Sequence, residues 1–248
     1  MPSVCLIVPC YNEARRLDRN AFQRFVDDTP DVSICFVNDG SRDGTDAVLS
    51  ALQHDRPEKI QIINLPQQVG KAEAVRQAML QVHAGHTAEF IGYWDADLAT
   101  PLEQVRTLCR HAESLPRCLM VLGSRINRLG ASVRRKPSRH YSGRVFATFA
   151  SVTLGLPVYD TQCGAKLVHR SVVPELFGTP FVSRWIFDVE VLARLRNLVG
   201  SETLLASTIE APLGEWRDVS GSNLGVRQML RAPLDLWRIG RRYNRRSA

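Results

Sequence analysis

The segment Tyr93-Trp94-Asp95-Ala96-Asp97-Leu98 decides the fold and marks the candidate site. It ends an apolar run over residues 88–93 that predicts a buried strand, and Thr100-Pro101 follows, where proline suits the first turn of a helix. Asp95 and Asp97 therefore lie at the carboxyl end of a strand, where open α/β sheets bind their ligands. We expect both side chains to point to one side and to share a hard divalent cation, Mg²⁺ or Mn²⁺, with phosphate oxygens. A surface turn whose acids cap the next helix is the alternative for this pair taken alone.

The rest of the chain alternates apolar runs with helical segments. Strands are predicted over 4–8, 32–37, 60–64 and 88–93, with helices over 21–28, 46–53 and 70–83 between them. Further on we expect helices over 102–114, 142–154 and 187–199, strands over 118–123, 165–169 and 203–211, and a final helix over 226–243 that Pro233 kinks or breaks. Short links between strand and helix predict a doubly wound, mostly parallel α/β sheet.

Polar residues follow each of the first four strands. They are Tyr11, Asn12, Glu13, Asp39, Lys71, Asp95 and Asp97. Because the carboxyl ends of parallel strands meet at one edge of a sheet, we expect these residues to line one ligand-binding crevice. Each of them alone could equally be a capping or solvated loop residue. Neither G-x-G-x-x-G nor G-x-x-x-x-G-K-[ST] follows the first strand, which argues against a Rossmann dehydrogenase and a P-loop NTPase.

Length and composition bound the class of protein. The chain has 248 residues, 44% of them hydrophobic, which is enough for one large α/β domain or two small ones. No apolar run approaches the length of a membrane span, and the first strand starts almost at Met1, so we expect no signal peptide and a cytoplasmic protein. Six scattered cysteines without a C-x-x-C spacing predict reduced, buried thiols rather than disulfides or zinc ligands.

Positive charge is concentrated in two places. The net charge is +7, residues 114–159 contain no Asp or Glu, and the C-terminal tail is rich in arginine. The cations of the acid-free segment are Arg117, Arg125, Arg128, Arg134, Arg135, Lys136, Arg139 and Arg144. Such segments favour anionic partners, either phosphates or an acidic membrane face. Nucleic acid is the weaker expectation, because these clusters lack interleaved aromatic residues and no nucleic-acid-binding motif is present.

Several motifs, in their order along the chain, resemble one family. Val-Pro-Cys-Tyr-Asn-Glu from Val8, Val-Asn-Asp-Gly-Ser-Arg-Asp-Gly-Thr from Val37, Gly-Lys-Ala from Gly70 and Asp-Ala-Asp from Asp95 resemble the nucleotide-sugar domain of inverting family 2 glycosyltransferases with the GT-A fold. Asp-Thr-Gln-Cys-Gly-Ala-Lys, Trp-Ile-Phe-Asp-Val-Glu and Trp-Arg-Asp-Val-Ser-Gly-Ser look like the dolichyl-phosphate β-glucosyltransferase branch. The resemblance covers nearly the whole chain.

The resemblance implies a Rossmann-like, mostly parallel sheet with flanking helices. We expect one glycosyltransferase domain over residues 1–215, with a nucleotide-sugar-binding half over 1–115 and an acceptor half over 116–215. Residues 216–248 would form an acceptor loop and a basic, amphipathic C-terminal helix and tail.

Roles for individual residues are also implied by the resemblance. Nucleotide-sugar binding would involve Pro9, Tyr11, Asn12, Glu13, Asp39, Lys71, Asp95 and Ala96, with Asp39 on the base. Asp95 and Asp97 would bind the metal and the diphosphate and, with Asp188, form the catalytic set. Arg125, Arg135, Arg139, Gln162 and Ser222 would meet the acceptor and its phosphate. Related mannosyltransferases have Gln two residues after the second Asp, whereas Ala99 stands there in this chain, which favours the glucosyl branch.

The implied reaction is metal-dependent, inverting transfer of glucose from UDP-glucose to a polyprenyl or dolichyl phosphate. An ionised phosphate needs no general base, whereas a soluble hydroxyl acceptor would need one, such as Asp188 or Glu190. The alternative for Asp188 is a cap of the helix that starts beside it. The acid-free arginine segment favours the phosphate acceptor, because arginine binds phosphate oxygens bidentately. The alternatives are a transferase to a soluble hydroxyl acceptor, GDP-mannose as the donor, a nucleotidyltransferase, and an inactive nucleotide-sugar-binding module.

A prenyl acceptor lies in a membrane, so we expect the protein to dock peripherally on the cytoplasmic face. The candidates are helix 142–154, with Val145, Phe146, Phe149 and Val152, and the C-terminal helix, with Met229, Leu230, Leu234, Trp237 and seven arginines from Arg227 to Arg246. An apolar stripe flanked by arginine fits an interfacial helix beside anionic lipid. A helix packed on the core with a solvated basic tail fits the same pattern.

Overall fold

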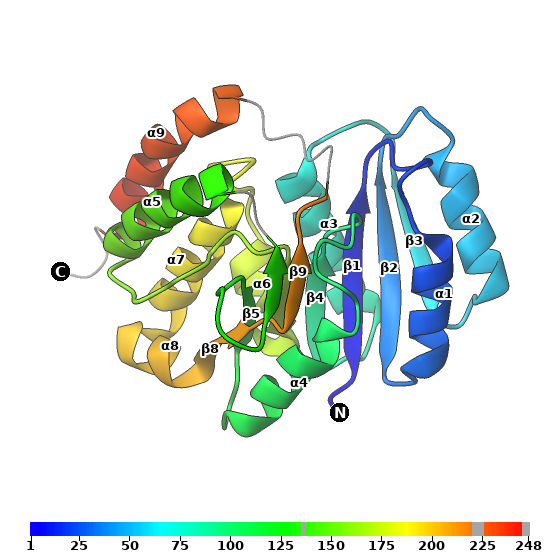
Figure 1. Ribbon diagram of the computed structural model, residues 1–248, viewed down its shortest axis with the longest axis horizontal. Coiled ribbons are helices and arrows are strands. Elements are labelled where there is room, and N and C mark those ends of the chain that lie inside the picture. Colours follow the sequence, from blue (N-terminus) through cyan, green and yellow to red (C-terminus); the bar gives the residue numbers. More distant parts are fainter. Residues whose placement is uncertain (135–136, 220–225, 245–248) are drawn as a thin grey trace.

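A central seven-stranded sheet organises the part of the chain that the computed structural model describes, residues 1–134, 137–219 and 226–244 (Figure 1). The strand order is β3-β2-β1-β4-β7-β5-β8. The bounds are β1 (Val4–Cys10), β2 (Val32–Asp39), β3 (Ile60–Leu65), β4 (Phe90–Trp94), β5 (Met120–Ser124), β7 (Ala165–His169) and β8 (Thr208–Pro212). The first four strands are parallel, β7 is antiparallel to both β4 and β5, and β8 is parallel to β5. The expected mostly parallel α/β sheet is confirmed.

Helices cover both faces of this sheet. They are α1 (Arg19–Asp28), α2 (Thr45–Asp55), α3 (Lys71–Gly85), α4 (Gln104–Ser114), α5 (Pro137–Leu154), α6 (Val173–Phe177), α7 (Phe187–Val199), α8 (Ser201–Ser207) and α9 (Val226–Tyr243), with a 3₁₀ turn over Arg170–Val172 before α6. Alternate side chains of β1 enter two separate cores, as strand geometry requires. Leu6 and Val8 share one core with α1, α2 and α4, whereas Cys5 and Ile7 share the other with α3, α6 and α7.

Strand register brings the loops of the first half to one edge. Cys10 pairs with Asn38, and Ile7 pairs with Tyr93, so the segments after β1, β2 and β4 begin close together. Gly40 secures the loop after β2, because its φ is +64° and a Cβ there would lie 2.6 Å from the backbone carbon of Gln67. The carboxyl edge of β1, β2 and β4 is therefore one continuous polar surface.

Two expectations for the second half were wrong in detail. Residues 203–207 belong to helix α8, and the last strand of the sheet starts only at Thr208. Leu204 is buried and Leu205 is exposed, and so short a pattern fits one turn of a helix as well as a strand, which is why the sequence did not distinguish them. Of the expected kink or break at Pro233, the break does not occur: helix α9 runs through Pro233, and Leu236 and Ile239 beyond it pack into the core shared with α5 and α7.

A second, two-stranded sheet was not predicted. Its strands are β6 (Ser132–Arg134) and β9 (Glu215–Arg217), which pair in parallel with Arg134 opposite Arg217. Each strand has only three residues and one buried side chain, Val133 or Trp216, so no periodic pattern marks it in the sequence. This ribbon joins the acid-free segment to the C-terminal part of the chain.

The cysteines are as the sequence predicts. All six cysteines are free and buried, which confirms the prediction of reduced thiols. Burial raises the pKa of Cys5 to about 11, so this thiol stays protonated at neutral pH. Within the described residues, no helix is both long and apolar enough to cross a bilayer.

A buried ion pair fixes α7 to its surroundings. The Glu190 carboxylate accepts hydrogen bonds from Arg194 (2.9 Å), the Tyr243 hydroxyl (2.8 Å) and the backbone N of Val182 (2.7 Å). Arg194 also donates to the backbone oxygens of Leu176 (2.7 Å) and of two residues in the following loop. Glu190 is therefore a structural residue that ties α7 to α9 and to the loop after α6.

Glu190→Ala should lower the free energy of unfolding by about 3–5 kcal/mol, because it leaves the buried Arg194 guanidinium without its counter-charge. Denaturant unfolding followed by circular dichroism measures this loss. Glu175→Ala, which removes an exposed carboxylate from α6, is the matched control and should leave the unfolding free energy nearly unchanged. Equal stability of the two variants would contradict the structural role.

Candidate active site at the carboxyl edge of the sheet

Three elements meet at the Asp95 carboxylate. Asp95 directly follows β4, and its backbone N donates to the Gly164 oxygen (3.1 Å) just before β7. Lys71, the first residue of α3, donates to Asp95 Oδ1. A Cβ on Gly164 would lie 1.9 Å from Asp95 Oδ2, so only glycine allows the carboxylate to occupy this place. Burial alone would lower the pKa of Lys71, but the Asp95 and Asp188 carboxylates raise it above its ordinary value.

A turn, rather than strand alternation, sets the direction of Asp97. β4 ends at Trp94, the Leu98 N donates to the Asp95 oxygen (3.3 Å), and the Ala99 N donates to Asp97 Oδ1 (3.1 Å). The expectation that strand geometry sets the direction of both side chains was therefore wrong in its reason, because β4 ends before Asp95. Burial raises the pKa of Asp97, and the negative charge of Asp95 raises it further. The two carboxylates are close enough to repel one another.

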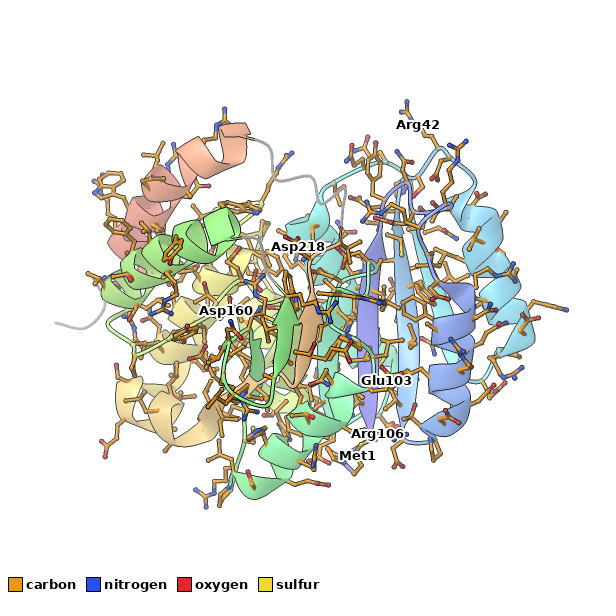
Figure 2. All side chains as sticks on the ribbon, in the orientation of Figure 1. Met1, Arg42, Glu103, Arg106, Asp160 and Asp218 are labelled. Atoms are coloured by element: carbon orange, nitrogen blue, oxygen red, sulfur yellow. The ribbon has the colours of Figure 1, made fainter. Side chains whose placement is uncertain are left out.

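Asp97 also lines a cavity of about 360 Å³. The residues around this cavity are Arg16, Asp18, Ala96, Asp97, Leu98, Arg217, Asp218 and Val219. The strand β9 carries Arg217 to this position, because its backbone N donates to the Ala99 oxygen (2.9 Å). Figure 2 shows Asp218 in the middle of the molecule, beside the end of β9. Carboxylates and guanidinium groups therefore share one hollow next to Asp95.

The loops after β1 and β2 are bound to each other. The Asn12 N donates to Ser41 Oγ (3.0 Å), and the Glu13 N donates to Thr45 Oγ1 (2.8 Å). Burial raises the pKa of Glu13, and although Arg16 opposes this, the Asp97 charge adds to it, which shows that the first loop lies within electrostatic reach of the acidic pair. Pro9 lies in β1 just before this loop.

A larger cavity of about 600 Å³ opens beside these loops. It is lined by Tyr11, Asn38, Gly40, Ser41, Arg42, Asp46, Ser50, Asn64, Leu65, Pro66, Gln67 and Gln68. Asp39 is buried, and its carboxylate accepts hydrogen bonds from the backbone N of Val69 (2.7 Å) and Gly70 (2.9 Å). These bonds hold the chain just before Lys71, so Asp39 helps to position that lysine.

A second cluster of charges lies where α7 begins. Asp188 Oδ1 accepts a hydrogen bond from the Tyr93 hydroxyl (2.8 Å) and forms an ion pair with the fully buried Lys166 Nζ (2.7 Å). Gln162 Nε2 faces Asp188 Oδ2 at 3.5 Å. No side-chain cap is present at the start of α7, so the alternative role of Asp188 as a helix N-cap is not observed. Asp188 is instead a fixed negative charge facing Gln162.

Arg125 has a carboxylate partner of its own. Its Nε and Nη2 atoms donate to the two Asp160 oxygens (2.6 and 2.7 Å), and the guanidinium lies 5.4 Å from the Trp216 ring centroid. Burial alone would raise the pKa of Asp160, but Arg125 lowers it to about 2, so the pair stays ionised at neutral pH. The positive charge of Arg125 is thus largely offset within the protein.

Comparison with known proteins identifies the family. The model for glycosyl transferase family 2 matches residues 5–177. This chain belongs to glycosyl transferase family 2. Dolichyl-phosphate β-glucosyltransferase ALG5C of Trichomonas vaginalis is 31% identical over 245 residues, which covers 94% of this chain and 69% of that protein. ALG5D of the same organism is 30% identical over 250 residues, covering 95% of this chain and 72% of the relative.

A solved structure shows the same fold. Glucosyl-3-phosphoglycerate synthase from Mycobacterium tuberculosis, in complex with Mn²⁺, UDP-glucose and phosphoglyceric acid, superposes with a TM-score of 0.69 at 15% sequence identity. The match covers 96% of this chain and 80% of that chain. The expected fold class and the resemblance to family 2 glycosyltransferases are confirmed.

The structure gathers the predicted donor residues of this glycosyltransferase, and it describes two of the five predicted acceptor residues, Arg125 and Gln162, with their side chains. Tyr11, Asn12, Glu13, Asp39, Lys71, Asp95, Ala96 and Asp97 lie at or next to the carboxyl edge of the sheet, and Gln162 contacts Asp188. Arg125 is bound by Asp160. Arg135 and Ser222 lie outside the described residues, and so does the side chain of Arg139.

Four residues at the site were missed from the sequence. Arg217, Lys166, Asp160 and Gly164 each contact or adjoin a predicted residue. All four lie in the motifs that carried the resemblance, but those motifs do not say which charge meets which. Lys166 carried a further signal, because a lysine inside the apolar strand Ala165–His169 needs a buried counter-charge.

The carboxylate oxygens of the site suit a hard divalent cation, and the protein would supply only part of its coordination. Asp95 and Asp97 supply carboxylate oxygens, which Mg²⁺ and Mn²⁺ prefer, and a cation would relieve their repulsion. No group of three or more His, Cys, Asp or Glu residues that could hold a metal occurs in the described part of the chain. The arrangement therefore fits an ion that shares its coordination with ligand phosphates and water, rather than a closed protein cage.

Gly164→Ala should slow sugar transfer about 100-fold, because the added methyl group displaces the Asp95 carboxylate by an ångström or more. Steady-state rates measure the effect, and circular dichroism checks the fold. Gly214→Ala is the control, since a Cβ there would lie 3.7 Å from its nearest neighbour, Gln104 Oε1. A normal rate in the Gly164 variant would remove this close contact from the catalytic geometry.

Proposed function

We propose that this family 2 glycosyltransferase transfers glucose from UDP-glucose to a polyprenyl or dolichyl phosphate, with inversion at the anomeric carbon and with Mg²⁺ or Mn²⁺. The observation that carries the proposal is the extent of the match to dolichyl-phosphate β-glucosyltransferases, which covers 94% of this chain and so includes the acceptor half. A solved neighbour of the same fold, glucosyl-3-phosphoglycerate synthase, holds UDP-glucose and Mn²⁺.

The donor would lie along the carboxyl edge of the sheet. Its nucleoside would enter the larger cavity beside Tyr11, with Asp39 holding the neighbouring loop. Its diphosphate would reach Lys71, Asp95 and Ala96. Bound between Asp95 and Asp97, the metal ion would neutralise negative charge on the leaving diphosphate. The Lys71 ammonium would add positive charge on the α3 side of the same group.

The acceptor phosphate would lie on the opposite side of the sugar. Arg217 lines the cavity that contains Asp97 and would supply positive charge there, whereas the charge of Arg125 is largely offset by Asp160. Arg16 lines the same cavity and lies 3.3 Å from the Glu13 carboxylate. A phosphate monoester is already ionised at neutral pH, so the protein need not remove a proton from it. Its task is to hold two anions together, which arginine does well through its planar fork of donors.

Asp188 and Gln162 would orient the sugar from the α7 side. Lys166 and Tyr93 fix Asp188 Oδ1. The carboxylate therefore cannot turn away, and its Oδ2 atom, which Gln162 faces, is available to a sugar hydroxyl.

Because a prenyl acceptor is a membrane lipid, transfer would occur at a membrane surface. We place it on the cytoplasmic face.

The proposal is tested by donor and acceptor choice. Purified protein is incubated with Mg²⁺ or Mn²⁺ and labelled UDP-glucose or GDP-mannose, with polyprenyl phosphate or with phosphoglyceric acid as acceptor. Label from UDP-glucose should enter the organic phase only when the prenyl phosphate and the metal are present. Transfer to the soluble acid alone, or from GDP-mannose alone, would replace the proposal with that reaction. Absence of transfer with every pair would contradict it altogether.

Asp97→Asn should reduce metal-dependent transfer about 100-fold or more, because it removes a charged oxygen from the metal and leaves the side-chain volume unchanged. Glu103→Gln, on an exposed residue just before α4, is the matched control and should transfer normally. Undiminished turnover by the Asn variant at every metal concentration would remove Asp97 from the mechanism.

Arg217→Ala should raise KM for the prenyl phosphate about tenfold and change KM for UDP-glucose little, because a charged hydrogen bond to phosphate is worth about 1.5–3 kcal/mol. Arg217→Lys should recover part of the affinity, since it restores the charge without the fork. Arg110→Ala, which removes an exposed guanidinium from α4, is the control. A change confined to the donor KM would place Arg217 on the donor instead.

A further inference from the structure

The helices α5 and α9 lie side by side at one end of the molecule (Figure 1). Asn244, just beyond α9, donates to the Thr153 oxygen on α5 (3.0 Å), and a Cβ on Gly240 would lie 3.1 Å from the Thr153 side chain. The two helices therefore form one rigid surface. Both helices come after a strand of the β6–β9 ribbon in the chain, since α5 follows β6 and α9 follows β9.

This surface exposes large apolar side chains. They are Tyr141, Val145, Phe149 and Val152 on α5 and Leu234 and Trp237 on α9, and we call them the apolar patch. Val152 is 76% exposed and Phe149 is 61% exposed, which is unusual for side chains of this size on neighbouring turns. The spacing of the α5 members by four, four and three residues places them on one face of the helix.

The opposite faces of both helices are already satisfied. Ala147, Ala150 and Leu154 of α5 are buried, and so are Leu236 and Ile239 of α9. Phe146, which the sequence grouped with the membrane-facing residues, packs inward, with its ring 5.9 Å from that of Trp185. Both helices therefore pack on the core through faces other than the one that exposes the apolar patch. The side chains of Met229 and Leu230 lie outside the described residues.

Positive charge lies beside the apolar patch on α9. Exposed arginines of α9 are Arg231, Arg238, Arg241 and Arg242, and the Arg241 guanidinium lies 5.3 Å from the Trp237 ring centroid. The one acid of this helix, Asp235, accepts from Ser183 Oγ (2.7 Å) and faces Arg238 at 3.4 Å. On the α5 side, the chain has no Asp or Glu between residues 114 and 159. The patch is thus bordered by arginines on its α9 side and has no acidic residue of α5 beside it.

These properties favour a lipid surface over a second copy of this chain as the partner. A second copy of this chain would bring one arginine border against another, which like-charge repulsion disfavours. Anionic phospholipid offers the complementary arrangement, because aromatic and branched side chains enter the acyl boundary while arginines stay at the headgroups. The exposed Trp237 ring and the Arg241 guanidinium, 5.3 Å from its centroid, already combine an apolar ring with a charge that could reach a headgroup phosphate.

We propose that the apolar patch of α5 and α9 is a docking surface for an anionic phospholipid bilayer. Binding through this surface requires neither donor nor acceptor, so it is independent of the proposed reaction. It would bring the β6–β9 ribbon, with Arg217 beside the acidic pair, towards a lipid phosphate presented by the same bilayer.

The test is co-sedimentation of the full chain with vesicles of phosphatidylcholine alone or with phosphatidylserine added, in the absence of nucleotide sugar and metal. The wild type should partition into anionic vesicles and only weakly into neutral ones, and added salt should weaken the binding. A variant carrying Phe149→Ser and Trp237→Ser should lose about tenfold or more in partitioning, because two large side chains no longer enter the acyl boundary.

Matched variants separate this patch from general surface effects. Leu198→Ser with Leu205→Ser removes two exposed leucines from α7 and α8 and should bind as the wild type does. Arg241→Glu with Arg242→Glu should remove the preference for anionic vesicles. Because all six substituted residues are exposed, thermal unfolding should be nearly unchanged in every variant.

Three results would overturn the docking surface. The first is a wild type that binds no vesicle. The second is a control variant that loses as much binding as the Phe149/Trp237 variant. The third is self-association, seen by sedimentation velocity and abolished by the Phe149/Trp237 variant, without vesicle binding. If vesicle binding holds while prenyl phosphate receives no sugar, the proposed function fails and the docking surface stands.

Discussion

The Asp95 carboxylate is the point on which the geometry of the site depends. It leaves the end of β4, accepts from Lys71 at the start of α3 and packs against Gly164 before β7. A negative charge beside a second carboxylate is tolerated only with positive charge close by, so the position of α3 is part of the site. Asp39 in turn holds the two backbone N–H groups just before Lys71. The carboxyl edge of the sheet is therefore arranged around one charge and the elements that compensate for it.

Charged side chains in the second half of the chain follow the same rule with different partners. Lys166 pairs with Asp188, Arg125 with Asp160 and Arg194 with Glu190, and all six side chains are largely buried. Such pairs add little net stability, because desolvation cancels much of the attraction, but they fix the directions of their members. Two of the three pairs adjoin residues at the site. A reaction that brings two anions together needs fixed charges more than it needs a movable base. Asp188 fits this requirement, because Lys166 and Tyr93 hold its carboxylate and no side chain caps the start of α7.

Helices and strands could be predicted from local sequence pattern, whereas the partners of the charged side chains could not. The four parallel strands, the polar loops behind them and the helix over Phe187–Val199 were predicted because apolar periodicity is a local property. The helix at Ser201–Ser207 was missed because its short apolar stretch fits either structure, and the β6–β9 ribbon because three residues carry no period. Arg125 was expected to meet a phosphate, yet Asp160, thirty-five residues further on, binds it. The sequence around Arg125 does not indicate that Asp160 is its partner.

The sequence by itself determined the family, the α/β sheet and the group of polar residues that ends β1, β2 and β4, since each of these rests on short motifs or on local hydrophobic pattern. Only the tertiary structure decided that Asp97 shares a cavity with Arg217, that Lys166 holds Asp188, and that Phe146 packs inward while Phe149 stays exposed. The physical reason is that a charge finds its partner, and an apolar side chain its burial, through contacts between elements that are distant in the chain. Local pattern fixes which residues need a partner, and packing fixes which partner they have.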